Sequence, residues 1–331
     1  MDFGITFKGD ISPARTRALC TQAEVAGFTY GWFFDSHVLW RDCYPNIAMC
    51  MEHTENMTFG PLVTNPGVRE WSVAASKFAA LLEQSGGRFE AAVGRGDSSR
   101  RVLGKKPMTV KNMGEYVDAI RALAKGDKVE YHGTEAQFPW AGDHTLKVWV
   151  AGYGPKALAS AGVHGDGLVI QLADPGLIKW FNKQAVDAGE KAGKDMTDFS
   201  LMAAAPVWVG DMDKAREQTR WFPAMVGNHV ADIVERHGIK SDDIPHYFTE
   251  YVKGRKGYDY KEHADKDADH LDFISNDVID AFGILGSVDD HIKKLKELEK
   301  VGVTQFNIYL MCGEEERIVA EYGEHIIPEF Q

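Results

Sequence analysis

Short runs of apolar residues recur along the chain, and longer stretches with helically spaced apolar positions separate them. Within each run almost every residue is apolar, which is typical of strands that are buried on both faces. Eight such runs predict strands at 3–7, 30–34, 57–64, 88–94, 147–153, 167–172, 201–209 and 304–310.

The stretches between these runs predict helices, and two of them end at Gly27 and Gly302. An eightfold alternation of strand and helix favours a (β/α)8 TIM barrel of the α/β class, formed as one domain by residues 1–331. An open doubly wound sheet is the alternative. The predicted helices cover 13–26, 68–85, 110–125, 155–163, 175–192, 211–236, 287–301 and 314–325.

Three segments interrupt this alternation, as insertions after the second, fourth and seventh strands. Residues 35–56 form a long connection rich in polar and aromatic residues, and residues 126–146 predict a hairpin-like excursion. Residues 239–286 are dense in charge. We expect this third segment to be a solvated helical cover, with a lid or a partner surface as the alternative.

Composition narrows the class of protein. The chain has 331 residues, 44% of them apolar, and a formal net charge of -12, which makes nucleic acid an unsuitable partner. No secretory signal or membrane-length apolar run is present, so no membrane association is expected. The four cysteines are scattered and form no disulfide pattern, and a cytoplasmic location fits best.

In a barrel the functional residues follow the strands, and glycine-rich turns follow two of the predicted ones. These are residues 94–97, GRGD, and residues 151–154, AGYG, which precede a proline suited to the first turn of a helix. Such turns can cradle a phosphate at a helix start, or they can be tight turns that bind nothing. Neither turn matches a dinucleotide or P-loop motif.

Asp35, His37 and Asp97 are the titratable candidates at the same end of the predicted strands. Histidines and carboxylates in a cleft can transfer protons near neutral pH. His37 can also be a purely structural residue. No cluster of Cys and His has metal-ligand spacing, so no metal is implied, and no nucleophile motif is present.

The third predicted strand ends in residues 60–66, GPLVTNP, where two prolines bracket residues that favour an extended backbone. This phrase and several others, in this order, give the sequence a resemblance to the luciferase-like flavin and deazaflavin oxidoreductases. Within them it is most similar to the methylenetetrahydromethanopterin reductase group. The other phrases are FGI at 3–5, EQSGGR at 83–88, GRGD at 94–97, GPK at 154–156, GDG at 165–167, DVID at 277–280, GSVDD at 286–290 and GVTQ at 302–305.

The resemblance implies a barrel that binds coenzyme F420, or alternatively FMN, at the carboxyl ends of its strands. It implies that the phosphate lies at turns 94–98 and 151–154. It also implies that the cofactor ring backs onto a bulge at residues 62–64, with a cis peptide bond between Leu62 and Val63. Two positions depart from the family pattern, because Ser36 separates Asp35 from His37 and because Thr6 stands where the reductases have an acidic residue.

The predicted site follows from these turns and from the resemblance. Its predicted catalytic residues are His37, Asp97 and Asp35. Its predicted cofactor-binding residues are Trp40, Leu62, Val63, Thr64, Gly94, Arg95, Gly96, Ser98, Ala151, Gly152, Tyr153, Gly154, Lys156 and Gln171.

The function expected from this site is hydride transfer between F420, or FMN, and a small organic substrate. One alternative is a monooxygenase that uses oxygen and reduced FMN from a separate flavin reductase. The other is a non-catalytic relative that binds a flavin or a protein partner. The resemblance also implies a homodimer.

Overall fold

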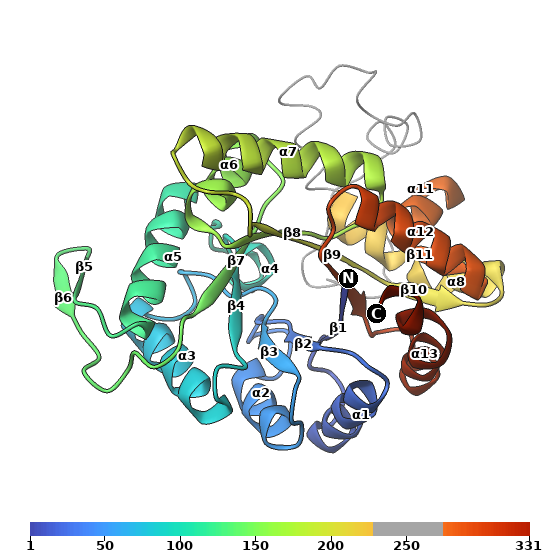
Figure 1. Cartoon of the computed structure of the whole chain (residues 1–331), viewed down its shortest axis with the longest axis horizontal. Coiled ribbons are helices and arrows are strands. Elements are labelled where there is room, and N and C mark those ends of the chain that lie inside the picture. The colour runs from blue at the N-terminus through green and yellow to red at the C-terminus, as the bar shows by residue number, and fades with distance from the viewer. Residues whose placement is uncertain (228–273) are drawn as a thin grey trace.

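Eight parallel strands form the centre of the molecule, and helices surround them (Figure 1). The computed structural model describes residues 1–227 and 274–331. The strands lie in the order β3-β2-β1-β12-β9-β8-β7-β4. Their bounds are β1 Asp2–Phe7, β2 Tyr30–Phe33, β3 Thr58–Pro61, β4 Glu90–Val93, β7 Lys147–Ala151, β8 Gly167–Ile170, β9 Ser200–Ala205 and β12 Gln305–Tyr309.

The two outer strands of this order, β3 and β4, meet and close the barrel. Parallel bridges join Phe59 to Phe89 and Thr64 to Val93. The backbone N–H of Thr64 donates to the carbonyl of Ala92 at 2.9 Å. The expected (β/α)8 barrel is therefore confirmed, and the open sheet is excluded.

Several helices begin where a polar side chain accepts hydrogen bonds from the first turn. Ser12 and Asp174 cap two of them in this way, and Glu70 caps a third, which therefore starts three residues later than predicted. The helices are α1 Pro13–Val25, α2 Cys43–Glu52, α3 Trp71–Ser85, α4 Asp97–Arg101, α5 Val110–Ala124, α6 Pro155–His164, α7 Pro175–Lys191, α8 Met212–Thr219, α11 Asn276–Phe282, α12 Val288–Lys300 and α13 Glu315–Glu321, followed by a π-helix at Tyr322–Ile326 and a 3-10 helix at Ile327–Phe330.

The segment 35–56, expected to be a long connection, contains α2, which is not among the predicted helices. Asp42 caps this helix, and Cys43, Ile47 and Cys50 are buried on one face of it. These positions recur at helical spacing, but the polar and aromatic residues between them hid the stripe in the sequence.

The seventh predicted strand is wrong in one respect, because it divides at Pro206. Beyond this proline, β10 (Val207–Val209) pairs in parallel with β11 (Ile284–Gly286) instead of continuing in the barrel sheet. The expected insertion at 239–286 lies outside the described residues up to residue 273. Its last part, residues 274–286, holds α11 and β11.

The expected hairpin is confirmed at residues 126–146. β5 (Val129–Tyr131) and β6 (Thr134–Ala136) are antiparallel and project away from the barrel (Figure 1). His132 and Gly133 make the turn with φ of 51° and 77°.

Large side chains fill the barrel interior. The rings of Trp32 and Trp149 meet edge to face, with centroids 6.5 Å apart. The indole of Trp32 donates to the side-chain oxygen of Gln305 at 3.1 Å. The interior is thus a packed core, and space for a ligand opens at the carboxyl ends of the strands.

Candidate active site

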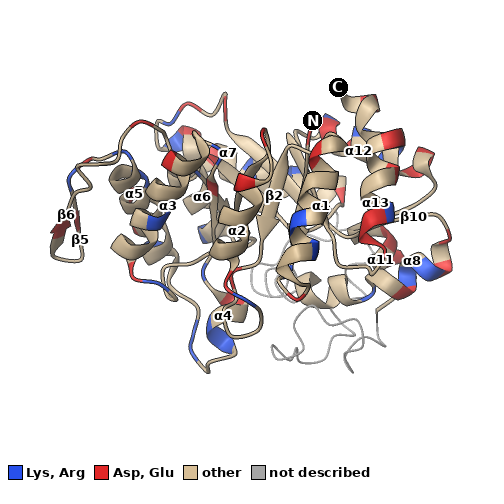
Figure 2. Ribbon diagram, turned by 90° about the horizontal axis from the view of Figure 1, so that it is seen from below, with Lys and Arg blue, Asp and Glu red and all other residues tan. Residues whose placement is uncertain are grey.

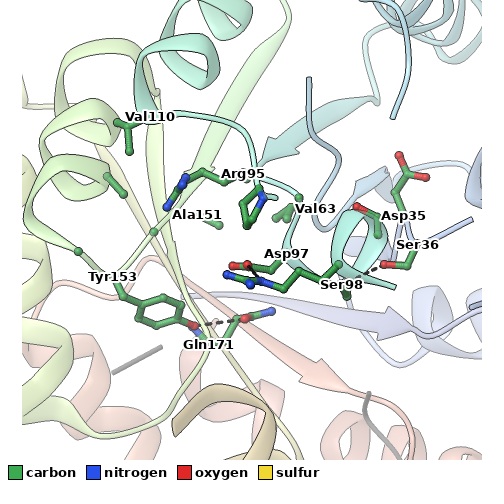
Figure 3. A pocket seen from close by; sticks show the side chains of 18 of the residues that line it. Asp35, Ser36, Val63, Arg95, Asp97, Ser98, Val110, Ala151, Tyr153 and Gln171 are labelled. Carbon is green, nitrogen blue, oxygen red and sulfur yellow. Dashed lines mark hydrogen bonds and ion pairs between the residues drawn. The ribbon is translucent and has the colours of Figure 1, made fainter. Parts of the chain in front are cut away.

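A cavity of about 1000 Å³ opens among the segments that follow β2, β3, β4, β7 and β8 (Figure 3). A space of this size can hold a cofactor together with a small substrate. Most of the residues predicted for the site line it, namely Asp35, Leu62, Val63, Gly94, Arg95, Gly96, Asp97, Ser98, Ala151, Gly152, Tyr153, Gly154, Lys156 and Gln171.

The phrase at 60–66 forms a bulge on one wall of this cavity. From Phe59 to Thr64 the third strand advances five residues, whereas its partner advances four, from Phe89 to Val93. One extra residue therefore sits between the two bridges, and the Leu62–Val63 peptide bond is cis. Both features agree with the expectation from the resemblance.

The glycines after β4 are required by this bulge. A Cβ on Gly94 would lie 2.8 Å from a methyl carbon of Val63. A Cβ on Gly96, whose φ is +82°, would lie 2.6 Å from the side chain of Asn65. The bulge and the turn at 94–97 therefore fit together only without these side chains.

The turn after β7 leads into α6 without a side-chain cap. Gly154 is the N-cap residue, and Pro155, which has no N–H, follows it. The N–H groups of Ala157 and Leu158 donate to the Gly154 carbonyl at 2.8 and 2.9 Å, which leaves the Lys156 N–H without an acceptor in the described chain. A Cβ on Gly154 would meet no atom within 4 Å, whereas one on Gly152 would lie 2.6 Å from Cβ of Ala157. Gly152 thus serves packing, and Gly154 leaves open space in front of the helix.

Cations gather at this side of the cavity. Arg95, Lys106 and Lys156 line it, are exposed, and form no ion pair within the part of the chain that the structure describes. The guanidinium of Arg101 instead donates to the Asp97 carboxylate at 2.6 Å. Cations without carboxylate partners in the described chain, beside the Lys156 N–H at a helix start, form a site suited to an anion.

Asp35 lies at the opposite side of the cavity from Arg95 and Ala151 (Figure 3). Its carboxylate is buried and accepts hydrogen bonds from Thr64 at 2.8 Å, from Tyr44 at 3.4 Å and from Arg69 at 2.9 Å. These donors fix the position of the carboxylate. Thr64 itself does not line the cavity.

Ser36, rather than His37, faces the cavity. The Ser36 and Ser98 hydroxyl oxygens are 2.7 Å apart, and both residues line the cavity (Figure 3). His37 is exposed and does not line it. The Ser36 carbonyl accepts from the N–H groups of Leu39 and Trp40, so a turn starts there and directs the following residues away.

Trp40 lies one layer behind the cavity wall. Its ring packs on that of Phe34 with centroids 5.3 Å apart, and it is Phe34 that lines the cavity.

Several lining or supporting residues were not predicted from the sequence, among them Lys106, Arg69 and Tyr44. Lys106 belongs to a dibasic pair before a proline, which is a weak signal by itself. It reaches the cavity because mutual hydrogen bonds between Arg95 and Met108 fold the loop back. Arg69 and Tyr44 carry no local sequence signal, because each acts through a contact with Asp35.

The described chain shows neither a metal centre nor a membrane-spanning helix. Across residues 1–227 and 274–331, no group of three or more His, Cys, Asp or Glu side chains is arranged to hold a metal ion. Over the same residues, no helix combines the length and apolar character needed to cross a bilayer.

Comparison with known proteins identifies relatives along the whole chain. The luciferase-like monooxygenase family model matches residues 1–305. The 5,10-methylenetetrahydromethanopterin reductase of Archaeoglobus fulgidus is 31% identical, with 100% of each chain covered.

Two solved structures share the fold at 22% identity, each covering 100% of this chain and 99% of its own. One is the coenzyme F420-dependent tetrahydromethanopterin reductase from Methanopyrus kandleri, with a TM-score of 0.79. The other is an F420-dependent secondary alcohol dehydrogenase in complex with an F420–acetone adduct, with a TM-score of 0.80. The expected class of enzyme, a luciferase-like oxidoreductase, is confirmed. The chain belongs to the luciferase-like monooxygenase family.

Proposed function

We propose that this protein transfers a hydride between coenzyme F420 and a small organic substrate held in the cavity. The observation that carries the proposal is the set of three cations, Arg95, Lys106 and Lys156, at one side of the cavity. The side chain of F420 carries a phosphodiester and carboxylate groups, whereas FMN carries a single phosphate. Three cations without carboxylate partners in the described chain favour the ligand with more anionic groups.

The residues present fit such a cofactor. The N–H group of Lys156 at the start of α6 would hold its phosphate, and the open space at Gly154 would admit it. The bulge at Leu62 and Val63 would support the ring. The bound coenzyme would supply a hydride-accepting and hydride-donating carbon.

The chain's own polar groups would hold the substrate and move its proton. Asp97 is the carboxylate proposed for proton transfer, with Arg101 fixing its position at 2.6 Å. The Ser36–Ser98 pair would hydrogen-bond a polar group of the substrate. His37 lies outside this arrangement. We therefore propose that the hydroxyls of Ser36 and Ser98, and not His37, take part in catalysis. Asp35 would act as a fixed anion paired with Arg69.

Cofactor binding tests the proposal directly. The protein, freed of any bound cofactor, is titrated with F420 and with FMN, and binding is followed by fluorescence. We expect micromolar or tighter affinity for F420 and much weaker affinity for FMN. The reverse order would overturn the proposal.

An FMN-dependent monooxygenase is the second candidate, and the family whose model matches the chain carries that activity in its description. It predicts oxygen consumption when reduced FMN is supplied by a separate flavin reductase. Hydride transfer with F420 predicts no such consumption.

The first substrate to test is methylenetetrahydromethanopterin with reduced F420, since the relative from A. fulgidus is named for that reduction. A secondary alcohol is tested in parallel, since one solved structure of the same fold is an F420-dependent secondary alcohol dehydrogenase. The hydroxyl of Thr6, a position at which the resemblance places an acidic residue in the reductases, is buried without a hydrogen-bond partner in the described chain. We also propose a homodimer, which light scattering after size-exclusion chromatography would test.

A further inference from the structure

Three polar side chains form a hydrogen-bonded chain across the ends of three different strands. Tyr153 follows β7, Gln171 follows β8, and Tyr309 is the last residue of β12. The Tyr153 hydroxyl donates to the Gln171 side-chain oxygen at 3.2 Å and accepts from the Gln171 backbone N–H at 3.0 Å. The Gln171 amide nitrogen donates to the Tyr309 hydroxyl at 2.6 Å.

This chain leaves two polar hydrogens without an acceptor among the described residues. The carboxamide of Gln171 has two N–H hydrogens, and Tyr309 takes one of them. The Tyr309 hydroxyl accepts this hydrogen bond, and its own hydrogen has no acceptor among the described residues. A buried donor without a partner costs free energy unless a ligand supplies the acceptor.

Tyr309 is buried among aromatic rings, and its hydroxyl is linked to the cavity through Gln171. It is 1% exposed, and the rings of Phe34 and Phe222 each lie 5.5 Å from its own. Burial raises the pKa of Tyr309 well above its usual range, so the hydroxyl stays protonated at ordinary pH. Gln171 lines the cavity, and Tyr309 does not.

We propose that Tyr309 is a positioning residue that fixes the Gln171 carboxamide, so that Gln171 presents an N–H group to an acceptor atom of the bound cofactor ring. Tyr153 fixes the other end of the same amide and lies on the same side of the cavity as Ala151 (Figure 3). The ligand is thus a planar heterocycle with a carbonyl oxygen or ring nitrogen along one edge. This inference rests on the proposed function for the identity of that heterocycle.

Three variants test it: Tyr309→Phe, Gln171→Leu and the two together. Tyr309→Phe removes one oxygen and keeps the ring, so the aromatic packing remains. We expect Tyr309→Phe to weaken F420 binding about tenfold, which corresponds to the loss of one well-placed hydrogen bond. We also expect the absorption band of the bound cofactor to move toward its position in free solution. The double variant is expected to bind no more weakly than Gln171→Leu alone, because both changes remove the same interaction.

Tyr322→Phe is the matched control. Its hydroxyl is also buried, and it is bonded to His291 at 2.9 Å, remote from the cavity. This variant is expected to lose thermal stability without any change in cofactor affinity or spectrum.

Additive losses in the double variant, or an unchanged affinity and spectrum in Tyr309→Phe, would overturn the inference. If the wild-type protein binds FMN instead of F420, the proposed function fails. The same variants then test the inference with FMN, whose ring carries similar acceptors.

Discussion

Among single residues, the four glycines around the cavity have different reasons to be glycine. A Cβ placed on Gly94, Gly96 or Gly152 would have neighbours at only 2.8, 2.6 and 2.6 Å respectively, so the fold itself requires these three. Gly154 has ordinary backbone geometry, with φ of -78°, and a Cβ there would meet nothing within 4 Å. Packing therefore explains three of these glycines, whereas the glycine at position 154 is better explained by space for a ligand.

Gly154→Val is expected to lower the free energy of unfolding by about 1 kcal/mol, because valine is a poorer N-cap than glycine, although its Cβ would meet no atom within 4 Å. It should weaken F420 binding by about tenfold or more, because the side chain would occupy the space in front of α6. Thermal unfolding and fluorescence titration measure the two effects. Ala159→Val, on the same helix but outside the cavity lining, is the control and should leave affinity unchanged. Equal affinity in both variants would show that no ligand group binds in front of α6.

Ser36 and His37 are adjacent in sequence, but only Ser36 lines the cavity. Ser36→Ala is expected to lower kcat/KM about tenfold through the loss of a hydrogen bond to the substrate. His37→Ala should stay within about twofold of wild type, because its side chain is exposed and does not line the cavity. Steady-state kinetics with F420 measure both. The opposite ranking would return the catalytic role to His37.

Among elements, α12 is held to its neighbours by a buried histidine. His291 bonds the Tyr322 hydroxyl at 2.9 Å and the Trp208 carbonyl at 3.0 Å, linking α12 to the π-helix and to β10. The ring nitrogen facing the carbonyl must carry the hydrogen, so the other nitrogen accepts from Tyr322. Burial lowers the pKa of His291 to about 4, and the native ring is therefore neutral.

This contact predicts a loss of stability in acid. In the unfolded chain His291 has an ordinary pKa near 6.5, so only the unfolded state takes up this proton as the pH falls from about 6.5 to about 4. The stabilisation by His291 should decline by about 3 kcal/mol over that range. Urea unfolding of wild type and His291→Gln at pH 7 and pH 4 measures this decline. The difference in the free energy of unfolding between the two proteins should be smaller at pH 4 than at pH 7. The exposed His325→Gln is the control, and its difference from wild type should stay nearly constant.

For the whole molecule, the charge at the cavity is opposite in sign to the net charge of the chain. The chain carries a net charge of -12, yet three cations without carboxylate partners in the described chain face the cavity. Figure 2 shows acidic and basic residues mixed over most of the helices, with basic residues on α4. An acidic protein that keeps a local cationic site can attract an anionic ligand to that site alone.

Replacing Lys106 and Lys156 by Gln is expected to weaken F420 binding about threefold to tenfold for each. The dependence of affinity on salt should fall at the same time, because fewer charges are left to screen. Titrations at low and high ionic strength measure both effects. Lys105→Gln is the matched control, since Lys105 is exposed beside Lys106 but does not line the cavity. An equal effect from Lys105 would mean that general charge, and not the site, governs binding.

The sequence alone determined the eight barrel strands and the two glycine-rich turns, because burial on both faces and turn chemistry are local properties. It failed at α2, where polar residues obscured the helical stripe, and at Pro206, where the strand leaves the barrel sheet to pair with β11. That pairing joins residues that are far apart along the chain, and periodicity carries no information about it.

The tertiary structure decided which side chains face the cavity. The turn that starts at Ser36 directs Ser36 inward and leaves His37 in solvent. Likewise, the Arg69 contact fixes Asp35, and the loop that returns at Met108 brings Lys106 to the site. The contacts at Asp35 and at Met108 join residues that are 34 and 13 positions apart in the sequence. The amino-acid pattern thus determined where the strands end, whereas packing between those ends decided which groups can meet a ligand.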